Sequence, residues 1–405
     1  MKRIAAKYGA FLRQPDVARL LLMSLVARMP VGMVAFAMLM FLREALGNFT
    51  LAGSAVGISF VALAAVAPIQ GRLIDLYGPR RLLAVTGAVQ PLALAATLVS
   101  AKLGLPFATI AGCAAVAGMF ASPITTLTRT IWRHRFDREE DRRTAFALDA
   151  VAIEMNFTLG PAIVAAVLAT FGATAAFAMA IAFVVLALFS FFASGALKFV
   201  KPAAGVERHL LGPLTEPRLW LVFIATFGLT LSFGLLEVGY PAFGTALGSP
   251  ALGGLLLALN AFGSGLGGAL YGGMAFKVPV ERQFAWAVGL MAVPLLLHAV
   301  LVPFPWPFAV VAFFAGVLIA PSVAAQSVLV ARLAPAHYAT EAFTWSSTFI
   351  VSGLGAGMAV GGTLIETAGI RSAFVTAGAI AFAMALLALL LPVSRAAGPS
   401  PRPAE

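Results

Sequence analysis

Charged residues and cysteine are scarce in this sequence of 405 residues. Only 11% of the residues are charged and one is a cysteine, Cys113, whereas 61% are hydrophobic. A soluble domain usually has about 25% charged and about 45–50% apolar residues. The shortage of charge therefore excludes an ordinary soluble enzyme and a disordered chain, and the single cysteine excludes an internal disulfide. Because Cys113 lies within an apolar run, we expect it to pack as a small hydrophobic side chain.

Long apolar runs are abundant instead. One membrane-spanning helix needs roughly 20 apolar residues, and these runs are of that length and apolar on all sides, unlike the alternating segments of about ten residues that build a membrane barrel. The basic N-terminus followed by a long first run predicts an uncleaved first span. The runs predict an all-α membrane protein with twelve transmembrane helices, near residues 18–42, 53–75, 81–100, 105–128, 144–168, 174–197, 218–243, 250–275, 284–302, 306–330, 341–365 and 371–392.

Lysine and arginine divide unequally between the two sides of the predicted membrane. With the N-terminus in the cytoplasm, 23 of the 27 lie in inner segments, and only three, Arg43, Lys102 and Arg371, lie in outer loops. Cytoplasmic loops carry the basic excess in membrane proteins. The division predicts a multi-pass protein of the cytoplasmic (inner) membrane with both termini inside. It explains the net charge of +11 by contact with lipid headgroups, without nucleic acid.

The two halves of the chain resemble each other. Five short matches recur in order at offsets of 197–201 residues; in one of them Gly118 and Pro123 recur as Gly316 and Pro321. A duplicated six-helix unit predicts two pseudo-symmetric bundles, an architecture in which transporters bind substrate between the repeats. The predicted division is an N-terminal bundle at 1–197, a central cytoplasmic loop at 198–217, a C-terminal bundle at 218–392 and a disordered cytoplasmic tail at 393–405.

The loop between the second and third spans reads GRLIDLYGPRR. This resembles the signature of the major facilitator superfamily, in which Gly and Asp precede a second Gly and a basic pair. Leu76 stands where the family usually has a basic residue, and Pro79 displaces the pair by one. The resemblance covers the chain to about Leu391 and implies a transporter of the twelve-helix type. The matching residues are Gly71, Asp75, Gly78, Arg80 and Arg81.

The resemblance implies that this loop is a conformational latch. In the family the equivalent Asp contacts the start of span 11 and holds the inner side closed, so the expected partner of Asp75 is the segment 340–343. A carboxylate accepts hydrogen bonds from a helix N-terminus and favours its positive end. The alternative is that Arg80 and Arg81 only anchor lipid headgroups.

Spans 5 and 11 share a glycine-rich pattern. Antiporters of the family carry a Gly-Pro pair within a glycine-rich stretch of span 5, and Gly160 and Pro161 match that pair. Small residues let helices approach closely and slide. The antiporter pattern is thus divided between span 5 and span 11. It favours a transporter that exports its substrate, and the alternative is that these small residues only pack helices together. Span 11 supplies the glycine frame without the proline, through Gly353, Gly357, Gly361 and Gly362.

Ionisable groups inside spans are costly in lipid and are therefore functional candidates. Arg28 and Glu154 lie at similar depths, about 14–15 Å from the inner ends of their spans at 1.5 Å per residue. This predicts an Arg28–Glu154 ion pair, which either holds two helices together or lets Arg28 bind an anionic group and Glu154 carry a proton. The arginine that many proton antiporters have in span 4 is missing, which weighs against proton coupling. The candidates for a substrate or proton site are Arg28, Asp149, Glu154, Asn156, Glu237 and Asn260.

These observations predict a secondary active transporter that moves a small molecule by alternating access. They favour proton-coupled efflux of an amphipathic or weakly anionic compound. Proton-coupled uptake of a sugar or organic anion is the alternative, and a membrane-embedded enzyme or receptor is a remote one. The sequence has no Walker-type loop, catalytic constellation or metal-ligand spacing, so no catalytic residue, cofactor or metal is expected. The expected partners are the substrate, membrane lipid and protons, and the protein is expected to act as a monomer.

Overall fold

The computed structural model describes residues 11, 13–136, 138–199, 212–274, 276–335 and 339–392. Within these ranges the chain is helical and forms no strand. The first half contains α2 (Val17–Leu46), α3 (Phe49–Tyr77), α4 (Pro79–Lys102), α5 (Phe107–Met119), α6 (Ile124–Arg135) and α7 (Glu139–Ser194). The second half contains α8 (Pro217–Ala246), α9 (Pro250–Gly273), α10 (Val280–Leu301), α11 (Pro305–Val317), α12 (Ile319–Leu333), α13 (Ala339–Ala368) and α14 (Ile370–Leu389). The predicted tail at 393–405 and most of the predicted central loop lie outside the described residues.

The helices account for the twelve predicted crossings. Eleven helical stretches of the described chain are long and apolar enough to cross a membrane. One of these stretches, within α7, has 51 residues and includes Gly172 at φ 84° and ψ 175°, a conformation that side chains other than glycine rarely adopt. Because α7 turns at Gly172, it supplies two crossings and brings the total to twelve. The pairs α5–α6 and α11–α12 each form one crossing.

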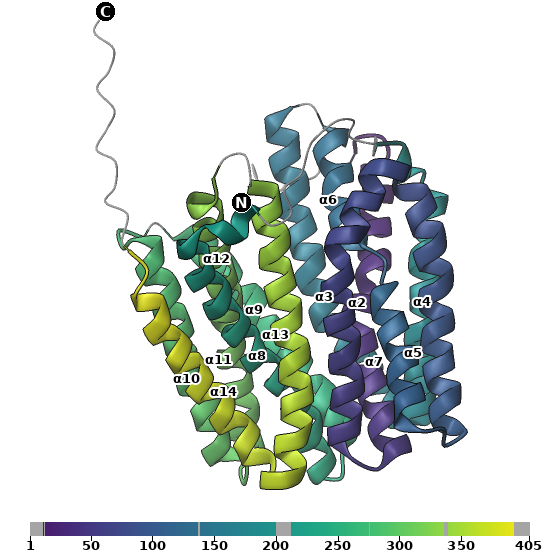
Figure 1. Ribbon diagram of the computed structural model, residues 1–405, viewed down its shortest axis with the longest axis vertical. Helices are drawn as coiled ribbons and strands as arrows, with labels where there is room; N and C mark the ends of the chain where they lie inside the picture. The colour runs from purple at the N-terminus through teal and green to yellow at the C-terminus, as the bar shows by residue number, and fades with distance from the viewer. Residues whose placement is uncertain are drawn as a thin grey trace, which may run out of the picture.

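The two halves stand side by side as two helical bundles (Figure 1). Both ends of the described chain lie toward the top of this view, and we call this the terminal side. Glycines in the left-handed region, Gly47, Gly172 and Gly369, mark the turns on the opposite side, which we call the distal side. The distal turns are short, since α2 ends at Leu46 and α3 begins at Phe49, closer together than the sequence predicted.

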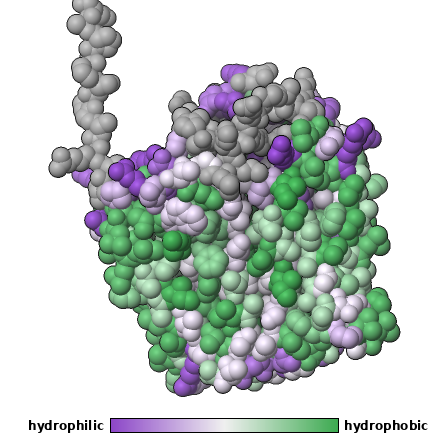
Figure 2. All heavy atoms as spheres, in the orientation of Figure 1, coloured by the Kyte–Doolittle hydropathy of each residue, from purple (hydrophilic) through white to green (hydrophobic). Residues whose placement is uncertain are grey.

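Large apolar side chains cover the outside of the bundles. Leu92, Phe171 and Trp306 expose 69%, 76% and 85% of their surfaces. Figure 2 shows broad hydrophobic flanks between hydrophilic residues at the two ends. Soluble monomers rarely expose apolar surface on this scale. These flanks therefore face lipid, and the chain is a multi-pass membrane protein.

The internal repeat is visible in the helix packing. A Cβ atom at Gly118 in α5 would overlap the carbonyl oxygen of Ser59 in α3. At the equivalent place in the second half, a Cβ atom at Gly316 in α11 would overlap the carbonyl oxygen of Asn260 in α9. The recurrence of Gly118 as Gly316 in the sequence therefore reflects one close approach that occurs in both halves. This confirms the predicted pair of pseudo-symmetric bundles.

Candidate functional site

Arg28 in α2 is buried against Asp149 in α7. The Arg28 Nη1 atom lies 2.5 Å from Asp149 Oδ1, and Nη2 lies 3.1 Å from Oδ2, which is a two-point contact between guanidinium and carboxylate. Trp132 in α6 donates from Nε1 to the same Oδ1 atom at 2.9 Å. Ser24 accepts from Arg28 at 2.6 Å and donates to Asp149 at 3.3 Å. The pair is therefore neutralised and hydrogen-bonded from three helices of the first half.

The predicted Arg28–Glu154 ion pair is wrong, because Asp149 is the partner of Arg28. Asp149 and Glu154 are five residues apart, which at about 100° per residue separates their side chains by about 140° around α7. The carboxylate of Asp149 faces α2 within the first half. Depth alone was therefore a poor guide, because the face of the helix decides which carboxylate meets the arginine.

Glu154 faces the other half of the molecule. A Cβ atom at Gly265 in α9 would lie 3.4 Å from Glu154 Cβ and 3.5 Å from its Oε2 atom. The Glu154 side chain is partly buried. Among the described residues it makes no hydrogen bond or ion pair, so this carboxylate stands without a partner between the two bundles.

Glu237 also points toward the first half. Each residue of a helix turns by about 100° around the helix axis. Measured around the axis of α8, Glu237 therefore lies between Gly244, about 20° away, and Gly234, about 60° away on the other side. Gly244 packs on α9, where its Cβ would lie 2.6 Å from Gly253 N, and Gly234 packs on α13 against the carbonyl of Leu354. Glu237 therefore points into the angle between α9 and α13, the two helices that make most of the contact with the first half. It too makes no hydrogen bond or ion pair with a described residue.

The two predicted asparagines lie in different surroundings. Asn260 is buried in α9 and donates from Nδ2 to the carbonyl of Ala312 in α11 at 2.9 Å, so it joins two helices of the second half. Asn156 is buried in α7 beside α2, and both polar atoms of its amide lack a partner among the described residues. Its backbone carbonyl touches the position that a Cβ at Gly32 would occupy.

Two glycine-lined seams join the halves. Between α3 and α13, a Cβ at Gly53 would lie 2.5 Å from the Met358 carbonyl oxygen. Between α7 and α9, a Cβ at Gly254 would lie 2.8 Å from the Pro161 carbonyl oxygen. Met358 and Pro161 occupy equivalent positions in the two glycine-rich patterns. The two seams are therefore equivalent contacts related by the internal repeat.

The remaining glycines of the predicted packing motif serve different contacts. Gly160 packs on Gly32 of α2, with 2.9 Å between its virtual Cβ and the Gly32 carbonyl carbon. Gly362 packs across the α3–α13 seam against Phe49. The other three lie against α8 within the second half: Gly353 on Phe227, Gly357 on Leu231 and Gly361 on Leu235.

We expect Gly53→Ala to lower the free energy of unfolding by about 1–3 kcal/mol, the usual cost of overpacking. The added methyl would press on the Met358 carbonyl, which belongs to a helix backbone and cannot rotate away. Thermal unfolding in detergent measures the loss. Gly71→Ala is the matched control on the same helix, since no atom lies within 4 Å of a Cβ there. Equal losses in the two variants would contradict the assignment.

A carboxylate joins the halves at the distal side. Glu366 near the end of α13 accepts a hydrogen bond through Oε1 from Phe49 N, the first residue of α3, at 2.7 Å. Thr50 donates to the carbonyl of Gly362 at 3.4 Å, and Asn48 caps the helix by accepting from Leu51 N at 2.8 Å. A negative charge at a helix N-terminus is stabilising. We call the Glu366–Phe49 contact the distal clasp; no sequence pattern indicated it.

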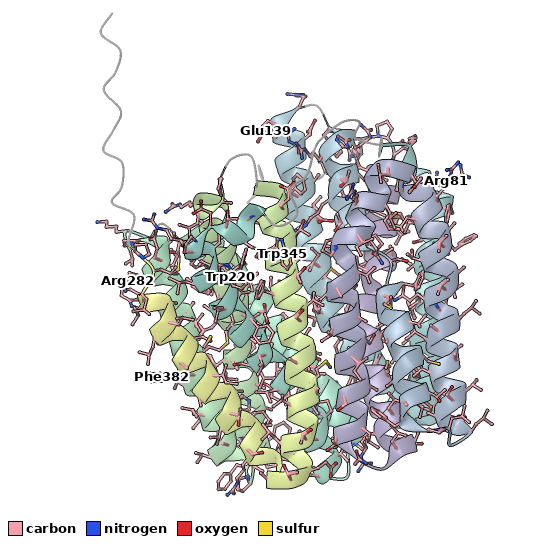
Figure 3. The ribbon with its side chains drawn as sticks, viewed as in Figure 1. Arg81, Glu139, Trp220, Arg282, Trp345 and Phe382 are labelled. Atoms are coloured by element: carbon pink, nitrogen blue, oxygen red, sulfur yellow. The ribbon has the colours of Figure 1, made fainter. Side chains whose placement is uncertain are left out.

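The predicted latch loop lies on the terminal side. Gly78 has φ 79° and ψ 159° between α3 and α4, so this turn requires glycine, whereas nothing packs on Gly71. Arg80 and Arg81 are exposed, and Figure 3 shows Arg81 at the rim of the terminal side. The Asp75 side chain and residues 336–338 lie outside the described parts. The contact predicted for Asp75 with 340–343 therefore stays a prediction.

Known proteins share this fold. The family model of the Major Facilitator Superfamily matches residues 20–220 and 222–405. The solved nucleoside transporter NupG is similar over 92% of this chain and 99% of its own, with 12% identity and a TM-score of 0.76. A bacterial homologue of the iron transporter ferroportin, solved in an inward-facing state, is similar over 92% of this chain and 97% of its own, with 14% identity and a TM-score of 0.74.

A third similar structure is a POT family transporter in complex with a thioalcohol-conjugated peptide. It matches over 92% of this chain and 95% of its own, with 12% identity and a TM-score of 0.71. No curated protein sequence matches the chain. At these identities the solved structures share the fold, and their different cargoes carry no information on the cargo of this chain.

Proposed function

Because the chain belongs to the major facilitator superfamily, we propose that it is a secondary active transporter that moves a small molecule across the cytoplasmic membrane by alternating access. The observation that carries the proposal is the way the halves meet. The seams α3–α13 and α7–α9 are equivalent and pack through small residues, an arrangement that lets two rigid bundles pivot around a central site.

The terminal side is proposed to be cytoplasmic. The basic residues of the sequence concentrate there, and Arg80, Arg81 and Arg133 are exposed on it. In this orientation the distal clasp closes the outer side. A reporter fused to the C-terminus should then report a cytoplasmic position, and an external signal would overturn the orientation.

Coupling to protons is assigned to Glu154 and Glu237. Both carboxylates face the region between the halves without a partner, and protonation removes the cost of burying their charge. Arg28 is a weaker candidate for binding an anionic substrate group, because Asp149 already neutralises it. We propose proton-coupled efflux: an imposed pH gradient, acidic on the outer side, should drive export, and flux in the opposite direction would favour uptake.

Alternating access can be tested without knowing the substrate. The single cysteine, Cys113, is first replaced by serine, and spin labels are placed at exposed positions of the two halves. Arg133 and Ala331 report on the terminal side, and Leu103 and Arg371 on the distal side. We expect the two distances to change reciprocally between pH 5 and pH 8 in liposomes. Fixed distances on both sides under every condition would overturn the proposed function.

A further inference from the structure

Few ionisable side chains lie deep in the helices. In the described helices, only four Asp, Glu, Lys, Arg or His residues lie more than two helical turns from either end of their helix: Arg28, Asp149, Glu154 and Glu237. Arg28 and Asp149 form one neutral pair. The charge that is not compensated inside the protein therefore consists of two carboxylates.

His298 does not add a positive group to this region. It is buried near the distal end of α10, with its ring 5.1 Å from that of Phe374 and 4.6 Å from that of Phe308. Its Nδ1 atom lies 2.6 Å from the Pro294 carbonyl oxygen, so this nitrogen carries a proton and donates. The Nε2 atom lies 3.4 Å from Tyr240 Oη. Both nitrogens are engaged within the second half.

The two carboxylates belong to opposite halves and face each other's bundle. Glu154 lies against Gly265 of α9, and Glu237 points between α9 and α13. The two carboxylates differ in depth. Pro241 of α8 packs on Gly253 of α9, so Glu237 lies opposite about Leu257. This is roughly 12 Å nearer the distal side than Glu154, at 1.5 Å per residue. A substrate that passes between the halves would meet first one carboxylate and then the other. An anionic substrate would meet two like charges and, among the described residues, no uncompensated cation in a low-dielectric region, where like charges repel most strongly. A cationic substrate would find both counter-charges in place.

We infer that the transported compound is an organic cation, whose charge Glu154 and Glu237 compensate in the region between the halves. The inference rests on the proposed function and revises its substrate class, since the sequence favoured a weakly anionic compound. The apolar faces of the surrounding helices suit a cation with an apolar body. Exchange follows from the same chemistry: when a monovalent cation leaves one of the two carboxylates, one proton takes its place there, so one positive charge replaces another.

Three probes of one shape and different charge test the inference at pH 7.5. They are N-methyl-4-phenylpyridinium (cationic), 4-phenylpyridine (neutral) and biphenyl-4-carboxylate (anionic). Equilibrium binding to the full chain in detergent is measured together with the thermal shift each probe causes. We expect the cation to bind at least tenfold more tightly than the other two. Glu154→Gln and Glu237→Gln should each weaken cation binding at least tenfold and leave the neutral probe unchanged.

Glu44→Gln is the matched control, because Glu44 is an exposed carboxylate at the distal end of α2, outside the region between the halves. The inference is overturned if the neutral or anionic probe binds as tightly as the cation, if no probe binds, or if the double variant Glu154→Gln/Glu237→Gln keeps the wild-type affinity for the cation. If one of these results is found while the spin-label distances still change reciprocally, only the inferred substrate class is wrong. If the spin-label distances stay fixed, the proposed function itself is wrong.

Discussion

Arg28→Gln and Asp149→Asn are each expected to lower the free energy of unfolding by about 3–5 kcal/mol, the usual cost of leaving one charge of a buried pair alone. The double variant is expected to recover most of this loss, because no buried charge remains. The Asp149→Asn change keeps an oxygen that can accept from Trp132 and Ser24, so these two donors retain an acceptor and the loss reports on charge. Thermal unfolding of the four purified proteins measures the cycle.

Transport by the same four proteins shows whether the Arg28–Asp149 pair only stabilises the fold or also takes part in transport. Because Arg28 and Asp149 face each other within the first half, the double variant should regain flux along with stability. Glu154→Gln is the comparison, since Glu154 has no partner to strand, and it should lower coupled flux while leaving stability near wild type. Additive stability losses in the cycle, or a stable double variant without flux, would contradict the structural role of the pair.

Glu366→Ala is expected to open the distal side. It removes a charge worth about 0.3–1 kcal/mol at a helix N-terminus and a hydrogen bond of about 0.5–1.5 kcal/mol. Glu366 is exposed, so water replaces part of both. We therefore expect the population with an open distal side to rise about threefold to tenfold, where 1.4 kcal/mol is tenfold. The label pair at Leu103 and Arg371 measures that population.

Two further variants make this result specific to the clasp. Glu366→Gln keeps an oxygen that can accept from Phe49 N but loses the charge, so its effect should lie between wild type and Glu366→Ala. Glu44→Ala removes an exposed carboxylate on the same side that makes no hydrogen bond with a described residue, and it should leave the distance unchanged. Equal shifts in Glu44→Ala and Glu366→Ala would show that general charge on this side, and not the clasp, sets the population.

Sequence patterns that depend on local chemistry predicted the fold well. Apolar runs report directly on membrane crossings, and the recurrence of Gly118 as Gly316 marked a backbone contact that the two halves share. The partner of Arg28 was mispredicted because depth along a helix says nothing about which face meets a neighbour. The distal clasp joins Phe49 to Glu366 across 317 positions of sequence, and only the packing of the halves reveals such a contact.

The distal clasp also makes the onset of opening abrupt. On α3, a Cβ at Gly57 would lie 2.5 Å from the carbonyl oxygen of Gly355 in α13, so this close contact can serve as a pivot. If α3 tilts about it, Phe49 lies eight residues away, a lever of about 12 Å at 1.5 Å per residue. An N–H···O hydrogen bond weakens beyond about 3.2 Å, only about 0.5 Å longer than the 2.7 Å seen here. A tilt of about 2–3° is therefore enough to begin weakening it. The clasp resists the first degrees of tilt and none of the later ones. It therefore acts as a threshold: it holds the distal side closed against small thermal fluctuations and does not oppose the rest of the opening motion.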